Sequence, residues 1–145
     1  MNKDNHRKFN LEEMALQSIK ILNIGKENMT KLLVGMDSPY SYKAIGVGNS
    51  ATAAAETDEH LLGTETNFKD GNTSYYQNDN GSYVAQWNST WVYNDLPSNQ
   101  ISEAAVAMNA TNGTTSCLLR CTFDTVTLDE DSSFALTLRV IPTQG

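Results

Sequence analysis

One dipeptide, Asn112-Gly113, constrains the fold of this chain most, because it lies between two runs that are apolar at every second residue. Asn-Gly is the commonest sequence of a type I′ hairpin turn, since both central residues of that turn need a positive φ. Burial of the apolar face fixes the register of such a hairpin. The expected cross-strand pairs are Met108 with Cys117, Val106 with Leu119, and Ala104 with Cys121. The opposite face is expected to carry Ala105, Ala107, Leu118, Arg120 and Thr122.

The same hairpin governs the interpretation of the two cysteines. Cys117 and Cys121 are about 13 Å apart along an extended strand, whereas a disulfide needs Cα atoms within about 7 Å. Both lie on the face expected to be apolar, where a free cysteine behaves as a small hydrophobic residue. We therefore expect two buried free thiols, and a bond between subunits is the less favoured alternative.

Composition favours a β-rich protein with polar loops. Asn, Thr and Ser make up 42 of the 145 residues, an enrichment typical of turns, caps and solvated strand faces. A formal net charge of −7 argues against nucleic-acid binding. No window approaches the roughly 18 apolar residues of a membrane span, and the polar N-terminus lacks the pattern of a secretory signal, so we expect the mature chain to begin at Met1 and to need no membrane.

The N-terminal segment predicts an amphipathic helix. Asn10 and Glu13 form a variant of the capping box, and Gly25 offers a C-terminal stop. The apolar stripe between them either covers the open end of the chain's own β-domain, which we favour, or docks onto a neighbouring subunit. This divides the chain into an arm and helix over 1–34 and a β-domain over 35–145. The candidate contact residues on the stripe are Leu11, Met14, Ile19 and Leu22.

The remainder of the chain alternates in the manner of strands separated by turns. The expected strands cover 42–47, 61–69, 73–77, 83–93, the two arms of the hairpin, and 133–141. Seven strands without intervening helices favour a mainly β fold, an antiparallel β-sandwich of the Ig-like or jelly-roll type, with the N-terminal helix appended. Trp87 and Trp91 share the more apolar parity of their strand, so we expect them in the core, although exposed they could form a sugar-stacking platform.

Residues able to support catalysis or cofactor binding are sparse. The histidines, His6 and His60, lie apart, and no nucleophile elbow or zinc-protease motif is present. Adjacent residues of an extended segment point to opposite sides, so Asp58-Glu59-His60 is expected to be a solvated loop and not a metal site. We therefore expect no enzyme activity and no cofactor or metal.

Two further motifs match only in part. Gly46, Gly48 and Ala51 fit the glycine pattern of a dinucleotide-binding loop, but the chain continues into hairpins and not into a βαβ unit. Asp129 and Asp131 begin like a calcium loop, yet an EF-hand needs glycine and glutamate where Phe134 and Val140 stand. A glycine-rich surface loop and an acidic turn are the expected structures.

Three stretches carry a resemblance to a known family. They are IGVGNSATAAAETDEHLLGTE at 45–65, WVYNDLPSNQISEAAVAMNATNGTTSCLLRCTF at 91–123, and DEDSSFALTLRV at 129–140. In these the chain resembles small virion proteins of tailed phages and prophages, of the tail, tail-fibre or head-accessory type. The resemblance implies a non-enzymatic structural protein located in the virion. It also implies contacts with copies of itself and with a major capsid or tail protein.

The alternative function is a glycan- or receptor-binding module of a tail fibre, in which a polar loop contacts host sugars. A second Asn-Gly turn, at Asn80-Gly81, and the turn of the organising hairpin supply such loops. The candidate contact residues in the two turns are Asn78, Asp79, Asn80, Thr111, Asn112 and Gly113.

Overall fold

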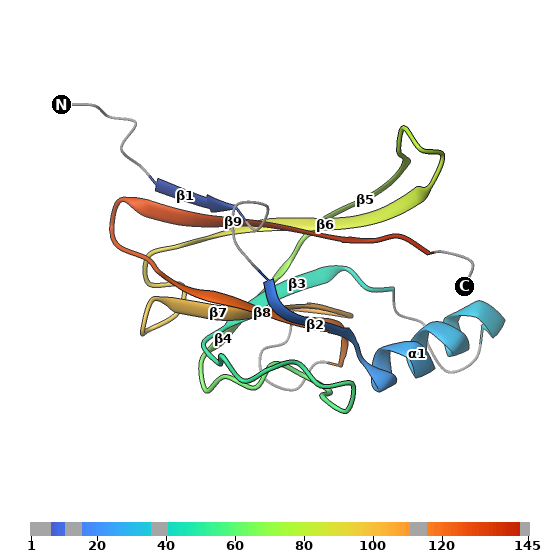
Figure 1. Cartoon of the computed structure of the whole chain (residues 1–145), viewed down its shortest axis with the longest axis horizontal. Helices are drawn as coiled ribbons and strands as arrows, with labels where there is room; N and C mark the ends of the chain where they lie inside the picture. Colours follow the sequence, from blue (N-terminus) through green and yellow to red (C-terminus); the bar gives the residue numbers. More distant parts are fainter. Residues whose placement is uncertain (1–6, 11–15, 36–40, 111–115, 143–145) are drawn as a thin grey trace.

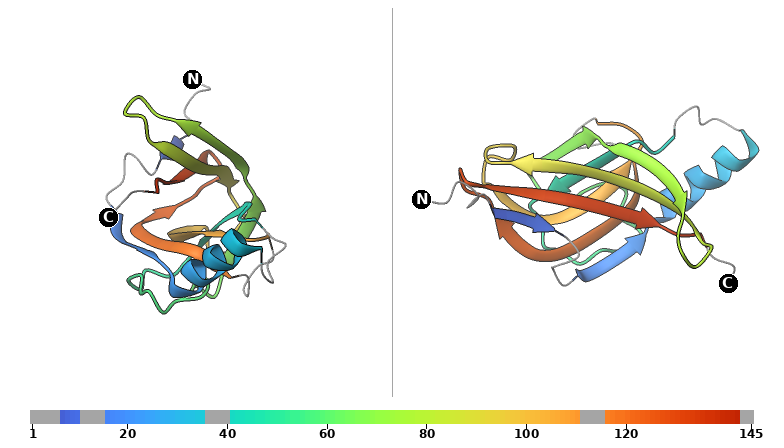
Figure 2. Two further views of the ribbon diagram at one scale, coloured as in Figure 1. Left: turned by 90° about the vertical axis from the view of Figure 1, so that its right-hand side faces the viewer. Right: turned by 90° about the horizontal axis from the view of Figure 1, so that it is seen from above.

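The protein folds into two facing β-sheets (Figures 1 and 2). A computed structural model describes residues 7–10, 16–35, 41–110 and 116–142. One sheet has the strand order β1-β9-β6-β5 and the other β2-β8-β7-β3-β4. The strands and the helix are β1 (Arg7–Asn10), β2 (Leu16–Ile21), α1 (Asn23–Val34), β3 (Ala44–Gly48), β4 (Thr66–Asp70), β5 (Asn72–Gln77), β6 (Tyr83–Val92), β7 (Gln100–Ala107), β8 (Cys117–Thr127) and β9 (Ser132–Val140).

This architecture confirms the predicted mainly β sandwich, with nine strands in the described residues where the sequence predicted seven. The two additional strands, β1 and β2, come from the segment that we assigned to an arm and helix. Each lies at one edge of a sheet: β1 pairs in parallel with β9, and β2 pairs antiparallel with β8. Both sheets are therefore completed by the start of the chain.

The helix predicted from Asn10 is wrong. Asn10 ends β1, the residues from Leu16 to Ile21 form β2, and the helix α1 begins only at Asn23. Pairing with β8 satisfies backbone groups that would otherwise line an open sheet edge, and this tertiary gain outweighs the helical periodicity of the segment. Gly25 lies inside α1, and the helix ends instead at Gly35, whose φ of 68° is the left-handed cap conformation.

Gly25 has a packing role. A Cβ atom built on it would lie 2.5 Å from the carbonyl oxygen of Leu118. The start of α1 therefore approaches the backbone of β8 more closely than any other residue type would allow. Leu22 extends this contact, because its amide donates to the same carbonyl oxygen at 2.9 Å.

The register predicted for the organising hairpin is confirmed at its centre. Val106 pairs with Leu119 and Ala104 with Cys121. A bulge between Val106 and Ala107 shifts the end of the ladder, so that Cys117 pairs with Ala107 where we expected Met108. The turn at Asn112-Gly113 lies outside the described residues.

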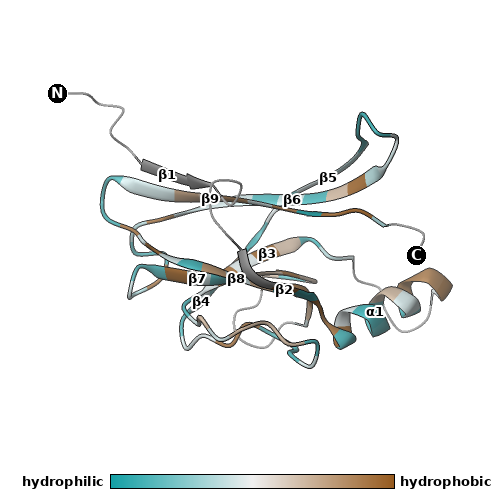
Figure 3. Cartoon of the chain, viewed as in Figure 1, coloured by the Kyte–Doolittle hydropathy of each residue, from teal (hydrophilic) through white to brown (hydrophobic). Residues whose placement is uncertain are grey.

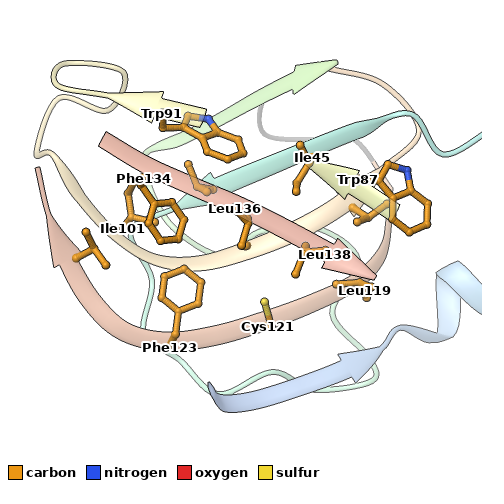
Figure 4. Packing of buried hydrophobic residues seen from close by; sticks show 14 of the residues in the cluster. Ile45, Trp87, Trp91, Ile101, Leu119, Cys121, Phe123, Phe134, Leu136 and Leu138 are labelled. Atoms are coloured by element: carbon orange, nitrogen blue, oxygen red, sulfur yellow. The ribbon is translucent and has the colours of Figure 1, made fainter. Parts of the chain in front are cut away.

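The main core fills the space between the sheets (Figure 4). Phe123 stacks on Phe134 with ring centroids 5.5 Å apart, and Trp91 lies against the same ring at 6.4 Å. Trp87 and Trp91 are 7% and 0% exposed, as the core interpretation predicted, and each indole N–H has a partner. Trp87 donates to the carbonyl of Tyr42 at 2.8 Å, which satisfies the one polar atom of the ring.

A second apolar cluster lies on the outer face of the five-stranded sheet. The connection over 49–65 and the start of α1 cover this face, so the side of the hairpin opposite the main core is buried too. The bulge in β8 also moves Cys117 into this outer cluster, whereas Cys121 stays between the sheets. The members of the outer cluster are Leu22, Leu61, Phe68, Ala105, Ala107 and Cys117.

Candidate interaction surfaces

The residues singled out from the sequence fall into three groups. Leu11, Met14, Thr111, Asn112 and Gly113 lie outside the described residues. On the predicted stripe, Ile19 is 48% exposed on the edge strand β2, whereas Leu22 is completely buried in the outer cluster and so is not available to a partner. The polar trio Asn78, Asp79 and Asn80 occupies the tip of the β5–β6 hairpin.

His6 lies outside the described residues, and the other residues considered for catalysis and metal binding are engaged in local hydrogen bonds. His60 lies in the connection over 49–65, with Nδ1 2.8 Å from the carbonyl oxygen of Leu61. In the acidic turn, the amide of Asp131 donates to Asp129 Oδ1 at 2.9 Å, and Ser132 closes the turn. Across the described parts of the chain, no group of three His, Cys, Asp or Glu side chains could hold a metal ion, and there is no pocket.

Neither cysteine has the environment of a nucleophile. Cys117 and Cys121 are buried thiols that form no disulfide, as expected from the sequence. Burial raises the pKa of each thiol to about 12, with the nearby carboxylate of Glu103 adding a smaller upward effect. A reactive cysteine needs a lowered pKa and solvent access, and these two side chains have neither.

A buried ionic cluster pins the connection over 49–65 to the outer face of the sheet. Its centre is the completely buried pair Arg120 and Glu103, in which Nε donates to Oε1 at 2.9 Å. The guanidinium also binds Asp58 Oδ2 at 3.2 Å and donates to the carbonyl of Thr52 at 2.8 Å. Arg120 therefore joins a central strand to two points of the connection.

Glu103 holds the same connection through backbone amides. Its carboxylate accepts from Leu62 N at 2.9 Å, Gly63 N at 2.7 Å and Ser50 N at 3.1 Å. With the bond from Arg120, both carboxylate oxygens have two partners, and charge-assisted bonds of this kind are the stronger ones. A buried charge needs such complete pairing, because a lone one would be very costly.

The glycine pattern near residue 46 is explained by this covering layer. A Cβ atom on Gly46 would collide with the ring of Phe68, which lies across it from β4. A Cβ atom on Gly48 would lie 2.5 Å from Glu103 Oε2. The two glycines make room for an aromatic ring and a carboxylate, which is a different role from cradling a phosphate.

In the β5–β6 hairpin, the outer strand β5 is open to solvent. All six residues of β5 are exposed, and β5 is the last strand of its sheet (Figure 1). Tyr75 is 80% exposed on β5, and Tyr83 on the neighbouring strand is 62% exposed. At the tip, Asn78 caps the turn by accepting from the amides of Asn80 and Ser82 at 3.0 and 2.9 Å.

A second exposed apolar surface lies at the C-terminal end of α1, which is brown in Figure 3. Leu33 and Val34 are 87% and 66% exposed there. The helix contacts the sandwich through its first two turns, around Leu22, Gly25 and Met29, whereas Leu33 and Val34 at its far end are exposed.

Comparison with known proteins identifies no relative: no protein-family model, no curated protein and no solved structure matches this chain. Within the described residues, the helix is too short and too polar to cross a membrane.

Proposed function

We propose that this chain is a non-enzymatic structural protein of a tailed-virus particle, in which it decorates the capsid or belongs to the neck or tail. It acts through contacts with copies of itself and with a major capsid or tail protein. The observation that carries the proposal is the exposed β5–β6 hairpin, an uncovered sheet edge with protruding tyrosines. Tyrosine is enriched at protein interfaces, and open strand edges favour pairing with another chain.

The rest of the described structure supports a contact protein. The charged side chains that lie deepest, Glu103 and Arg120, are fully engaged with each other and with the covering connection. They hold the scaffold in one arrangement and present no free group to a substrate. The exposed tyrosines of β5 and β6 lie on paired strands of the other sheet, and a contact surface that is already formed lowers the entropy that binding would cost. The resemblance to small tailed-phage virion proteins supplies the assignment to a virus particle.

The test is binding to purified particles. The protein is mixed with particles of the virus that encodes it, and the mixture is separated on a density gradient and compared with particles from a virus lacking the gene. We expect the protein to be present in native particles at a fixed ratio to the main shell or tail protein, and to rebind particles that lack it. Absence from native particles together with failure to rebind would contradict the proposal.

A second candidate function is glycan binding at the hairpin tip. Trp87 and Trp91 cannot form the stacking platform, because both are buried. The tip still places the exposed polar residues Asp79 and Asn80 near the exposed ring of Tyr83, and aromatic rings beside polar side chains are suited to sugars. Titration with host-surface glycans while the side-chain amide signals of the tip are followed by NMR tests it. Unmoved signals at millimolar glycan would eliminate this function.

A further inference from the structure

The outer edge of β5 offers a defined row of backbone groups. At the hairpin tip the amide of Asn78 donates to the carbonyl of Ser82 at 2.8 Å, so Asn78 directs its backbone groups towards β6. Neighbouring residues of an antiparallel strand alternate in this direction. Thr73, Tyr75 and Gln77 therefore point their N–H and C=O groups away from β6. No described strand pairs with that side of β5.

Charge distinguishes β5 from the other edge strands. The sequence of β1 contains Arg7 and Lys8, β2 contains Lys20, and β4 contains Lys69 and Asp70. Charged residues at edges protect natural sheets against pairing with other chains. The sequence of β5, NTSYYQ, has no charge and no proline, and its neighbour β6 is also uncharged. Among the described edges, β5 alone lacks this protection.

We infer that two copies of this chain associate by antiparallel pairing of β5 with β5, centred on Tyr75. This deepens the proposed function, on which it rests, because it names the surface of self-contact. In this register Tyr75 faces its own copy, and Thr73 faces Gln77 of the other chain. All the outward backbone groups of the three residues are then paired, and the two four-stranded sheets become one continuous sheet.

The side chains of β5 are compatible with a two-fold axis at Tyr75. In an antiparallel pair, residues directly opposite share a face, so the two Tyr75 rings meet on the same side of the joined sheet. The one charged residue of the hairpin, Asp79, lies four positions from the centre. Its two copies would be about 27 Å apart along the paired strands, which is beyond the Debye length of about 8 Å at physiological salt. The two Asp79 carboxylates are therefore kept apart, and the paired β5 strands themselves carry no charge.

The register is tested by charge reversal at the residue that faces itself. Tyr75→Lys and Tyr75→Glu each place like charges opposite one another, whereas an equimolar mixture places opposite charges there. Self-association is measured by sedimentation velocity across a concentration series at 0.15 M salt. We expect each variant alone to show at least about a tenfold higher dimer dissociation constant than the unaltered chain, and the mixture to recover a 1:1 heterodimer.

Tyr83→Lys is the matched control. Tyr83 is an exposed tyrosine of the same hairpin, but it lies on β6, one strand away from the proposed contact. We expect this variant to dimerise like the unaltered chain. Circular dichroism and thermal unfolding verify the fold of every variant, and we expect little change because both tyrosines are exposed.

Three outcomes would overturn the inference: an unaltered chain that is monomeric at millimolar concentration, charge variants at residue 75 that dimerise as well as the unaltered chain, or a mixture that forms no heterodimer. Binding to virus particles separates this result from the proposed function. A chain that binds particles but never dimerises would refute the strand pairing alone. A chain that dimerises through residue 75 but is absent from particles would refute the virion role alone.

Discussion

The outer face of the five-stranded sheet and the edge strand β5 are opposite extremes of the same sandwich. The first is covered by the connection over 49–65, which is bound by Glu103 on β7 and Arg120 on β8. The second is exposed along its whole length, and the described residues place no strand or side-chain cluster over it. The difference shows that this chain uses its strongest polar interactions to close one surface while it leaves another open.

Removing the guanidinium should disrupt the covered region most. Arg120→Met leaves the buried carboxylate of Glu103 without its cation, and breaking a buried ion pair in this way costs about 3–5 kcal/mol of unfolding free energy. Urea denaturation measures the loss. The double variant Glu103→Gln, Arg120→Met should recover part of it, since no buried charge then remains from the pair. Equal losses in the single and double variants would show that the pair does not act as a unit.

The labelling rates of the two cysteines should report separately on the outer cluster and on the core between the sheets. With each thiol pKa raised to about 12, the thiolate fraction at pH 8 is about a thousandfold lower than that of an ordinary cysteine of pKa about 9, so native-state labelling should be very slow. Cys117 lies in the outer cluster and Cys121 between the sheets. Arg120→Met should therefore speed labelling of Cys117 more than that of Cys121. Peptide mass spectrometry after timed labelling distinguishes the sites.

The raised thiol pKa values also predict how the unfolding free energy changes with pH. A thiol whose pKa is higher in the folded state than in the unfolded state favours folding below the unfolded value of 9.0. That contribution is lost as the pH rises towards 12. Unfolding free energies measured from pH 8 to pH 11 should fall, and Cys121→Ala should flatten the slope. A slope unchanged in that variant would contradict the role assigned to the thiol.

Adding a methyl group at Gly46 should test its close packing against Phe68. Gly46→Ala drives a Cβ atom into the ring of Phe68, and overpacking of this kind costs about 1–3 kcal/mol. Thermal unfolding measures the effect. Combining it with Phe68→Leu should cost less than the sum of the two single changes, because the smaller side chain vacates the contact. If the two losses of stability were additive, the strain in Gly46→Ala would not come from the Phe68 ring.

The open strand should show the smallest effect on the fold. Tyr75→Ala removes a ring that is 80% exposed, so the unfolding free energy of the dilute protein should change by no more than about 0.5 kcal/mol. Its effect should be confined to association. A loss of several kcal/mol in dilute solution would show that Tyr75 belongs to the core of a single chain.

Local patterns were sufficient to predict the centre of the sandwich. Asn112-Gly113 between alternating runs predicted the pairing of Val106 with Leu119, and strand parity predicted the burial of Trp87 and Trp91. These features depend on short-range chemistry, on turn preferences and on a period of two. The bulge that moves Cys117 to the outer cluster has no such local signal.

The covered face depends on contacts between distant residues, and sequence reasoning missed it. Glu103 meets amides from 50, 62 and 63, and Arg120 meets Asp58, so the site exists only after the connection folds back. A signal was present: Glu103 stands in the run ISEAAVA and Arg120 in the run CLLRC, each the one charged residue among small or apolar neighbours. The N-terminal strands were missed for a similar reason, because pairing with β8 and β9 outweighed the helical spacing of the segment.

Residue-resolved hydrogen exchange tests the central contrast most directly. Amides of Ser50, Leu62 and Gly63, which bind Glu103, should exchange slowly at every protein concentration. The outward amides of Thr73, Tyr75 and Gln77 should exchange rapidly in dilute protein and slow markedly as the concentration rises, because pairing then protects them. Rapid exchange of the first set, or protection of the second that does not depend on concentration, would contradict the division into a closed face and an open edge.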